Sequence, residues 1–465
     1  MERINAWKDY SDKQLAELEA LCTEYRDFLS RGKTERECAV LTVSMAEAAG
    51  YKNLDQIIEE GSAVKPGDKV YAQNMGKSVI LFRIGTEDIE KGMNILGAHI
   101  DSPRLDVKQN PLYENSDLAY LDTHYYGGVK KYQWVALPLA VHGVVAKKDG
   151  ETLNIVIGED ENEPVVGVTD LLPHLAAEQM KKQASVVIEG EKLDVLIGSR
   201  PLAENECKKD EKEKVKANIL KLLKDKYGIE EDDFLSAELE IVPAGKARDA
   251  GLDRSMIMSY GQDDRVCAFT SLKAILDVEA VERTACCILV DKEEIGSVGA
   301  TGMESKFFEN TLAELLDRMG VYSELKLRRV LKNSKMLSSD VNAAYDPLYA
   351  DAFEKKNASL AGYGMVFSKF TGARGKSGSN DANAEYIAKI RKVMDDAKVR
   401  FQLAELGKVD IGGGGTIAYI LALYGMDVID CGVAVLNMHA PWEVTSKADI
   451  YETKRGYEAF LKEMR

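Results

Sequence analysis

Residues 285–294 are Ala285-Cys-Cys-Ile-Leu-Val-Asp-Lys-Glu-Glu294, an unbroken apolar run followed by four charged residues. Such a run is typical of a strand buried on both faces, as the strands of parallel sheets are. Helical patterns flank it at residues 266–280 and 305–319. This alternation predicts an α/β fold with a mostly parallel sheet flanked by helices.

Similar patterns occupy both ends of the chain. The first fifty residues predict two amphipathic helices, the second beginning near Thr34, where Thr34-x-x-Glu37 resembles a capping box. Further strands are expected at residues 78–84, 94–98, 399–403 and 428–436, and further helices at 382–397, after Thr416 and at 446–464.

The pattern changes in the middle of the chain, where short β-rich runs at 135–145, 153–157 and 185–188 predominate. The simplest arrangement is one α/β domain built from residues 1–106 and 245–465. A β-rich domain, residues 107–244, is inserted into it.

Composition limits the possible functions and locations. The 465 residues are 45% hydrophobic and 30% charged, which is typical of a soluble globular protein. A net charge of −16 repels nucleic acid and anionic lipid, so we expect no nucleic-acid or membrane partner. We identify no signal peptide, and the longest apolar stretch, residues 134–146, is too short to span a bilayer. Seven scattered cysteines without a C-x-x-C pair indicate free thiols in a reducing cytoplasm.

Histidine is rare, with five in the chain, and two of the five directly follow apolar strands. In open α/β sheets the functional crevice lies beyond the carboxyl ends of the strands. One histidine there would be structural about as often as functional, and an exposed acidic pair is usually solvated surface. The combination is harder to explain structurally; it comprises His99, Asp263-Asp264, Glu293-Glu294, Asp340 and His439.

Imidazole and carboxylate ligands suit zinc, cobalt or manganese. Five ligands, one of them a bridging carboxylate, would hold two metals ~3.5–4 Å apart, a spacing used in metal-assisted hydrolysis. Residues i and i+2 of an extended chain share a face, so Asp101 can hold the second ring nitrogen of His99. Glu293, next to Glu294 but directed elsewhere, is placed to accept a proton from the attacking water.

Five motifs also resemble those of a known family: Gly97-Ala-His-Ile-Asp-Ser-Pro103, Asp263-Asp-Arg265, Asp291-Lys-Glu-Glu-Ile-Gly-Ser297, Ser338-Ser-Asp340 and Asn437-Met-His439. In this combination and order the chain resembles the aspartyl aminopeptidase family, which includes vacuolar aminopeptidase I and belongs to the dinuclear zinc exopeptidases. The resemblance extends over nearly the whole chain and is to the bacterial type of member. It implies a zinc exopeptidase-like fold and two divalent metals, with zinc favoured over cobalt or manganese.

The resemblance also implies a role for each site residue. Asp263 would bridge both metals, and relatives hold the following peptide bond in cis, so a cis Asp263–Asp264 bond is expected. The remaining implied roles are His99 and Asp340 on one metal, Glu294 and His439 on the other, Glu293 as general base and Asp101 as support for His99.

The inserted segment resembles the family's dimerisation domain and implies self-association into a dimer and further into a dodecamer. Leu172-Pro-His-Leu-Ala176 matches a motif whose histidine reaches the neighbouring subunit's active site. His174 is therefore a candidate substrate contact, with an ordinary surface or core histidine as the alternative. Lys369 is a candidate contact for an acidic substrate side chain, although an exposed loop lysine is the simpler interpretation.

We therefore predict a metal-dependent aminopeptidase that removes acidic or neutral N-terminal residues from short peptides. A water held between two metals would attack, with Glu293 as general base. The same ligands also suit a dinuclear carboxypeptidase or an amide deacylase. A scaffold protein with a decayed site is the non-enzymatic alternative.

Overall fold

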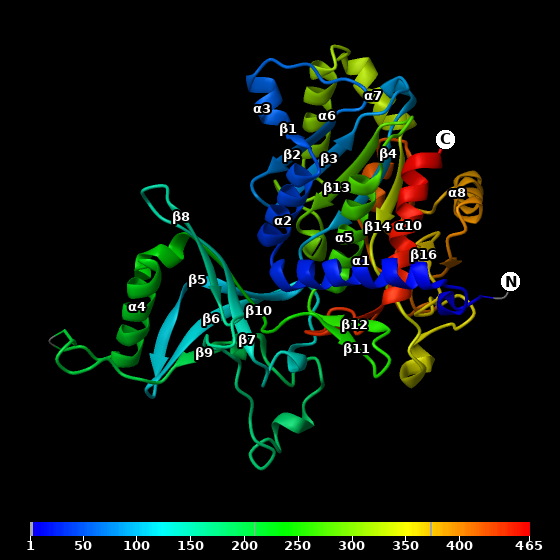
Figure 1. Ribbon diagram of the computed structural model, residues 1–465. Helices are drawn as coiled ribbons and strands as arrows, with labels where there is room; N and C mark the ends of the chain where they lie inside the picture. Colours follow the sequence, from blue (N-terminus) through cyan, green and yellow to red (C-terminus); the bar gives the residue numbers. More distant parts are fainter. Residues whose placement is uncertain (1–2, 209, 373) are drawn as a thin grey trace. The chain divides into compact units, whose positions relative to one another are not determined.

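The computed structural model describes residues 3–208, 210–372 and 374–465, which divide into two compact units (Figure 1). Unit 1 comprises Met1–Asp101, Ala247–Met438 and Glu443–Arg465, and unit 2 comprises Ser102–Lys246 and His439–Trp442. Within the described ranges, no helix has the length and apolar character needed to cross a membrane.

A nine-stranded sheet forms the centre of unit 1. Its strands, in spatial order, are β1 (Lys52–Asn53), β2 (Lys69–Asn74), β3 (Ser78–Arg83), β13 (Ala285–Val290), β4 (Asn94–His99), β14 (Lys335–Ser339), β18 (Asp427–Gly432), β16 (Met365–Ser368) and β17 (Phe401–Leu403). The helices of unit 1 are α1 (Asp12–Arg31), α2 (Glu35–Ala48), α3 (Leu54–Glu59), α5 (Gln262–Asp277), α6 (Phe307–Arg318), α7 (Glu324–Asn333), α8 (Ala384–Asp396), α9 (Ala418–Ala422) and α10 (Lys447–Glu463).

Helices cover both faces of this sheet (Figure 1). On β13, Cys287 and Leu289 pack in one core with α1, α2, α5, α8 and α10, whereas Cys286 and Ile288 pack in a second core with α3, α6, α7 and α9. Because successive strand side chains point to opposite faces, a strand buried on both sides must be apolar throughout. The strand predicted at residues 285–290 is confirmed with its boundaries, and so is the capping box of Thr34 and Glu37.

The prediction of a mostly parallel sheet is wrong for the chain as a whole. Parallel pairing runs through four central strands, β13, β4, β14 and β18, but β3 pairs antiparallel with β2 and β13, and β16 with β18. The sheet of unit 2 is antiparallel at every described pairing. Strands joined by tight turns, such as β2 and β3, can pair only antiparallel, because a parallel pair needs a long crossover.

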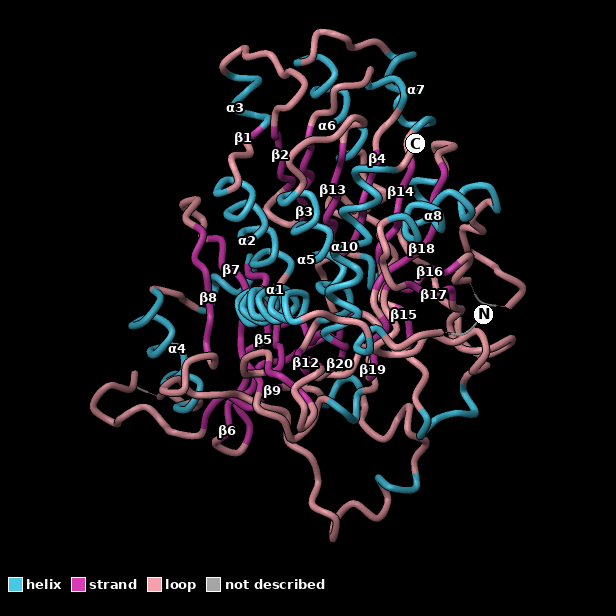
Figure 2. The backbone as a smooth tube through the Cα atoms, turned by 45° about the vertical axis from the view of Figure 1, so that its right-hand side comes forward, coloured by secondary structure: helices cyan, strands magenta, loops and turns pink. Residues whose placement is uncertain are grey.

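The segment expected as a single strand at 428–436 forms two strands, each in a different sheet of unit 1. The chain leaves the nine-stranded sheet after Gly432 and enters a five-stranded sheet at Ala434. This smaller sheet consists of β11 (Arg248–Ala250), β12 (Met256–Ser259), β20 (Glu443–Ser446), β19 (Ala434–Leu436) and β15 (Asn342–Ala343), several of which Figure 2 labels. A mostly apolar run, interrupted by Asp430, therefore contributes strands to two sheets, which periodicity alone does not reveal.

Unit 2 is built on a six-stranded sheet: β8 (Thr152–Ile157), β7 (Leu139–Ala146), β10 (Ala237–Pro243), β5 (Arg104–Asn115), β6 (Leu118–Tyr126) and β9 (Val195–Gly198). Helix α4 (Lys214–Tyr227) packs against β5, β6 and β9. The strand expected at residues 185–188 is a series of turns in a long loop. That loop exposes most of its side chains, so its apolar residues do not contribute to the sheet.

Candidate metal centre

The strand register brings the first candidate ligands to one edge of the nine-stranded sheet. Val290 of β13 pairs with His99 of β4, and Ser338 of β14 pairs with Gly97. Asp340, two residues beyond Ser338, is therefore level with His99. The carboxyl ends of parallel strands meet at the same edge, where functional crevices form in such sheets.

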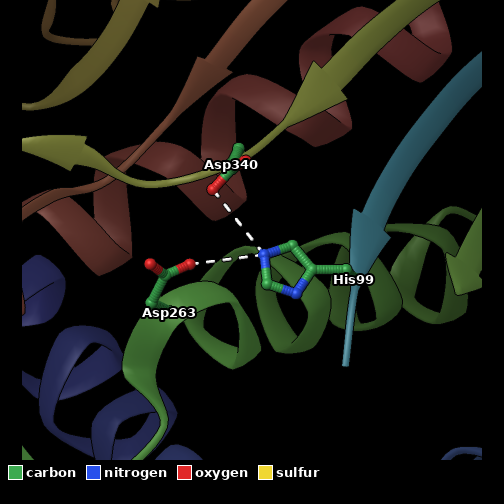
Figure 3. A group of neighbouring side chains, drawn as sticks. All are labelled: His99, Asp263 and Asp340. Atoms are coloured by element: carbon green, nitrogen blue, oxygen red, sulfur yellow. Dashed lines mark ion pairs between the residues drawn. The ribbon is translucent and has the colours of Figure 1, made fainter. Parts of the chain in front are cut away.

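His99 lies at the centre of this group, and its side chain is 1% exposed. Its Nε2 atom is 3.3 Å from Asp263 Oδ1 and 3.8 Å from Asp340 Oδ1, and Figure 3 shows the imidazole facing both carboxylates. The same nitrogen is 3.8 Å from Glu293 Oε2. Three carboxylates from separate segments thus converge on one imidazole nitrogen.

Asp263 enters the group from the first turn of α5, where Asp263 and Asp264 have non-helical backbone angles. The peptide bond between these two residues is cis, as expected. The backbone N–H of Asp263 donates to Glu443 Oε2 at 2.9 Å. The backbone that carries this carboxylate is therefore held by a contact outside its own helix.

Asp101 holds two parts of the site together. Its Oδ1 is 3.2 Å from His99 Nδ1, and the backbone N–H groups of Glu293 and Glu294 donate to Oδ1 and Oδ2 at 3.2 Å each. The sequence suggested the first contact but not the other two. One fully buried carboxylate thereby fixes the ring of His99 and the turn that carries both glutamates.

Electrostatics at this edge favour a cation. Burial raises the pKa of Glu293 to about 8; His99 opposes this rise, and Asp340, Asp101 and Asp263 add to it. Burial also raises the pKa of Asp340. Burial opposes charging of His99, but the carboxylates of Asp101, Asp263 and Asp340 raise its pKa well above the ordinary value. A bound divalent cation would relieve this crowding of negative charge.

The donor set fits a metal of the zinc type. Candidate ligand atoms of His99, Asp263 and Asp340 lie within 4.8 Å of one another, and so do those of His99, Glu293 and Glu294. One imidazole with carboxylates is a combination that zinc, manganese and cobalt accept. The residues present at this edge are therefore suited to the metal that the sequence predicts.

The remaining predicted residues lie in loops. His439 follows β19 in the segment 439–442, and its Nδ1 is 2.8 Å from the carbonyl oxygen of Gly128 within unit 2. His174 is exposed in the long loop of unit 2. Lys369 follows β16 and forms an ion pair with Asp381, whose other oxygen lies 3.0 Å from Lys376 Nζ.

Glu443 and Gln262, two buried residues next to Asp263 in the structure, were not identified from the sequence. Glu443 lies on β20 and is 1% exposed, and Gln262 is fully buried next to Asp263. Their only sequence signal is the polar pair Glu443 and Thr445 at alternating positions of a short strand, which a solvent-facing edge would equally produce.

Comparison with known proteins decides the family. The sequence model of the aminopeptidase I zinc metalloprotease (M18) family matches residues 28–461. The chain belongs to this family. It is therefore a metal-dependent aminopeptidase, a hydrolase, and the predicted family and activity are confirmed.

Individual relatives agree with this result. A Clostridium acetobutylicum protein named "Probable M18 family aminopeptidase 1" is 63% identical over 99% of this chain and 98% of its own length. The crystal structure of the M18 aminopeptidase from Thermotoga maritima has a TM-score of 0.93 and 45% identity, covering 99% of each chain. The mApe1 dodecamer of Saccharomyces cerevisiae has a TM-score of 0.78 at 20% identity, covering 97% of this chain and 98% of its own, which shows a shared fold.

Proposed function

We propose that the enzyme removes single N-terminal residues from short peptides by using two divalent metals at the edge of the nine-stranded sheet. The observation that carries this proposal is the convergence of Asp263, Asp340 and Glu293 on His99 Nε2, with separations of 3.3 to 3.8 Å. The catalytic domain would be residues 1–106 and 245–465, that is, unit 1 together with residues 102–106, 245–246 and 439–442 of unit 2. The remainder of unit 2, residues 107–244, would be the dimerisation domain.

The ligands would divide between two metals, with the Asp263 carboxylate available to both. His99 and Asp340 would complete one, and Glu294 and His439 the other. The place of His439 in the chain supports its assignment, because it lies four residues before Glu443, whose carboxylate accepts the Asp263 N–H at 2.9 Å. Zinc is the proposed metal, as the family description implies, with cobalt or manganese able to replace it.

When bound, the metals would polarise the scissile carbonyl, anchor the free α-amine and acidify water. The chain's own part in the reaction is proton transfer and positioning. The Glu293 carboxylate accepts the proton of the attacking water and later passes it to the leaving amine. Divalent cations held nearby would lower the pKa of Glu293, which burial raises to about 8, and would so favour the ionised base. Asp101 keeps this carboxylate in place through the Glu293 backbone N–H.

Substitution Glu293→Gln tests the base. We expect kcat to fall by ~10²–10⁴-fold, because the amide cannot accept the proton. Zinc content, measured by mass spectrometry of the dialysed enzyme, should stay at the wild-type value. Glu279→Gln, an exposed position in the loop after α5, is the matched control. Activity of Glu293→Gln within a few-fold of that control would remove Glu293 from this role.

Self-association through unit 2 is also part of the proposal. Unit 2 would mediate self-association into a dimer and a dodecamer, which the fold shared with the dodecameric yeast structure supports. Enclosed active sites would admit peptides and exclude folded proteins. Sedimentation velocity tests the assembly, and a single species of monomer mass would refute it.

Two residues would contact substrate. Exposed in unit 2, His174 would reach the active site of a neighbouring subunit, so His174→Ala should impair turnover with zinc content intact. Lys369 would accept an acidic side chain. Hydrolysis of a panel of aminoacyl-p-nitroanilides tests the latter: selective release of Asp and Glu supports it, and release of neutral residues alone rejects it.

A cytoplasmic location is also part of the proposal. All seven cysteines are free, and every one except Cys207 is buried, as expected for a protein of a reducing compartment.

A further inference from the structure

The proposed bridging ligand is held from behind by strand β20. Asp263 begins α5 with φ −81° and ψ 108°, outside the helical region, so the hydrogen bonds of the helix do not fix its backbone. Its N–H instead donates to Glu443 Oε2 at 2.9 Å, across 180 residues of sequence. The acceptor is a carboxylate, which strengthens such a bond relative to a neutral partner.

Gln262, the residue before Asp263, is held by hydrogen bonds to β20, β12 and α1. The Nε2 atom of Gln262 donates to the carbonyl oxygens of Glu443 at 2.7 Å and Ile257 at 3.1 Å. Its Oε1 accepts from Thr445 Oγ1 at 2.6 Å and from Tyr25 OH at 3.2 Å. An amide has two donor hydrogens and two acceptor lone pairs, so this buried side chain is fully used. It cannot rotate without breaking several bonds at once.

We propose that Glu443 and the Gln262–Thr445 pair are positioning residues that set where the Asp263 carboxylate lies. This inference rests on the proposed function, in which Asp263 is shared by two metals. A shared carboxylate must satisfy two ions ~3.5–4 Å apart, so its position tolerates little error. Supporting hydrogen bonds behind metal ligands typically change metal affinity or activity by ~10–100-fold when they are lost.

The burial of Glu443 argues that it has more than a packing role. Its side chain is 1% exposed, and a buried carboxylate is costly unless it is paired or hydrogen-bonded. A leucine of similar size would fill the same space at lower cost. What leucine lacks is an acceptor for the Asp263 N–H. The carboxyl group of Glu443 therefore lies where it directly restrains the backbone of the proposed ligand.

Three substitutions in the full-length enzyme test the proposal. Glu443→Leu removes the acceptor, Glu443→Gln keeps a carbonyl oxygen for the same N–H, and Thr445→Val removes one bond to Gln262. Thr123→Val is the matched control, because Thr123 is buried in unit 2 and donates to the Leu193 carbonyl oxygen at 2.8 Å. The probe is Zn²⁺ alone, in competition with a chromophoric chelator, with kcat and KM measured in parallel.

We expect Glu443→Leu to weaken zinc binding ~10–100-fold and to lower kcat more than it raises KM. Glu443→Gln should recover most of that affinity, and Thr445→Val should lose about fivefold, as for one hydrogen bond. Thr123→Val should match the wild type. Wild-type zinc affinity in Glu443→Leu, or equal losses in Glu443→Leu and Glu443→Gln, would overturn the proposal.

Two further outcomes keep the test decisive. If Glu443→Leu fails to fold by circular dichroism, equal zinc affinity in Thr445→Val and Thr123→Val overturns the positioning role. Zinc stoichiometry of the wild type reports separately on the proposed function. One zinc per chain would reject the two-metal assignment, whereas the comparison of the Glu443 variants would still measure the restraint on Asp263.

Discussion

Asp101→Asn is a sharp test of how the site is held together. The wild-type carboxylate uses both oxygens: Oδ1 contacts His99 Nδ1 and the Glu293 N–H, and Oδ2 accepts the Glu294 N–H, all at 3.2 Å. Asparagine offers one oxygen, and its NH₂ group must face a donor. The side chain is fully buried, so water cannot satisfy the group that loses its acceptor.

The size of the effect follows from these contacts. A buried donor left without an acceptor costs ~1–3 kcal/mol, which at ~1.4 kcal/mol per tenfold corresponds to about 5- to 150-fold. We expect this loss in kcat/KM, because the turn that carries Glu293 and Glu294 shifts relative to His99. Zinc affinity should fall by a similar factor, since Glu294 is a proposed ligand.

The assay is hydrolysis of an aminoacyl-p-nitroanilide at fixed zinc concentration, together with chelator competition. Asp291→Asn is the matched control, because Asp291 is also buried near the end of β13 but accepts from Thr301 Oγ1 at 2.6 Å. A change below twofold in Asp101→Asn, or an equal loss in the control, would refute the reasoning. The first result would show that the contacts are unimportant, and the second that any buried charge matters equally.

Two further predictions concern stability. Removing metal with a chelator should lower the melting temperature, because the crowded carboxylates around His99 lose their counter-charge. Added zinc at 100 times its Kd should restore ~2.7 kcal/mol of the free energy of unfolding. Differential scanning calorimetry that shows no dependence of the melting temperature on zinc would contradict this. Burial raises the pKa of Asp449 to about 7, against the opposing N–H bonds of Gly362 and Gly364. The folded state therefore holds this proton where the unfolded chain releases it, so the free energy of unfolding should fall as pH rises from about 4 to about 7. Asp449→Asn should show a flatter urea-denaturation profile over this range, and parallel profiles would refute the assignment.

Local pattern was sufficient where one segment decides its own structure. The apolar run at 285–290 indicated a strand buried on both faces, and Thr34 with Glu37 could cap a helix without distant contacts. Pattern failed where the outcome depends on a neighbour. The run at 428–436 divides between two sheets because different strands accept its two halves. Residues 185–188 pair with none of the strands that the structure describes.

Pairing direction was also beyond local pattern. Apolar strands look alike whether they run parallel or antiparallel to a neighbour, so the antiparallel strands β3 and β16 were not distinguished from the parallel centre. Motif spacing nevertheless identified the candidate ligands. His99, Glu294 and His439 follow predicted strands and Asp263 precedes a predicted helix, whereas Asp340 follows β14, a strand that was not predicted from the sequence.

By itself, then, the sequence determined which residues are available for metal chemistry and the family to which their motifs belong. Only the tertiary structure decided how they are held. Asp101 reaches the Glu293 turn across 192 residues, and Glu443 reaches Asp263 across 180. Such contacts depend on strand register and sheet order, which arise when distant segments pack together. Periodicity along the chain does not predict these contacts. At Asp101, Glu293 and Glu443 the local pattern indicates only a strand or a turn, and it does not indicate which distant residue each one contacts.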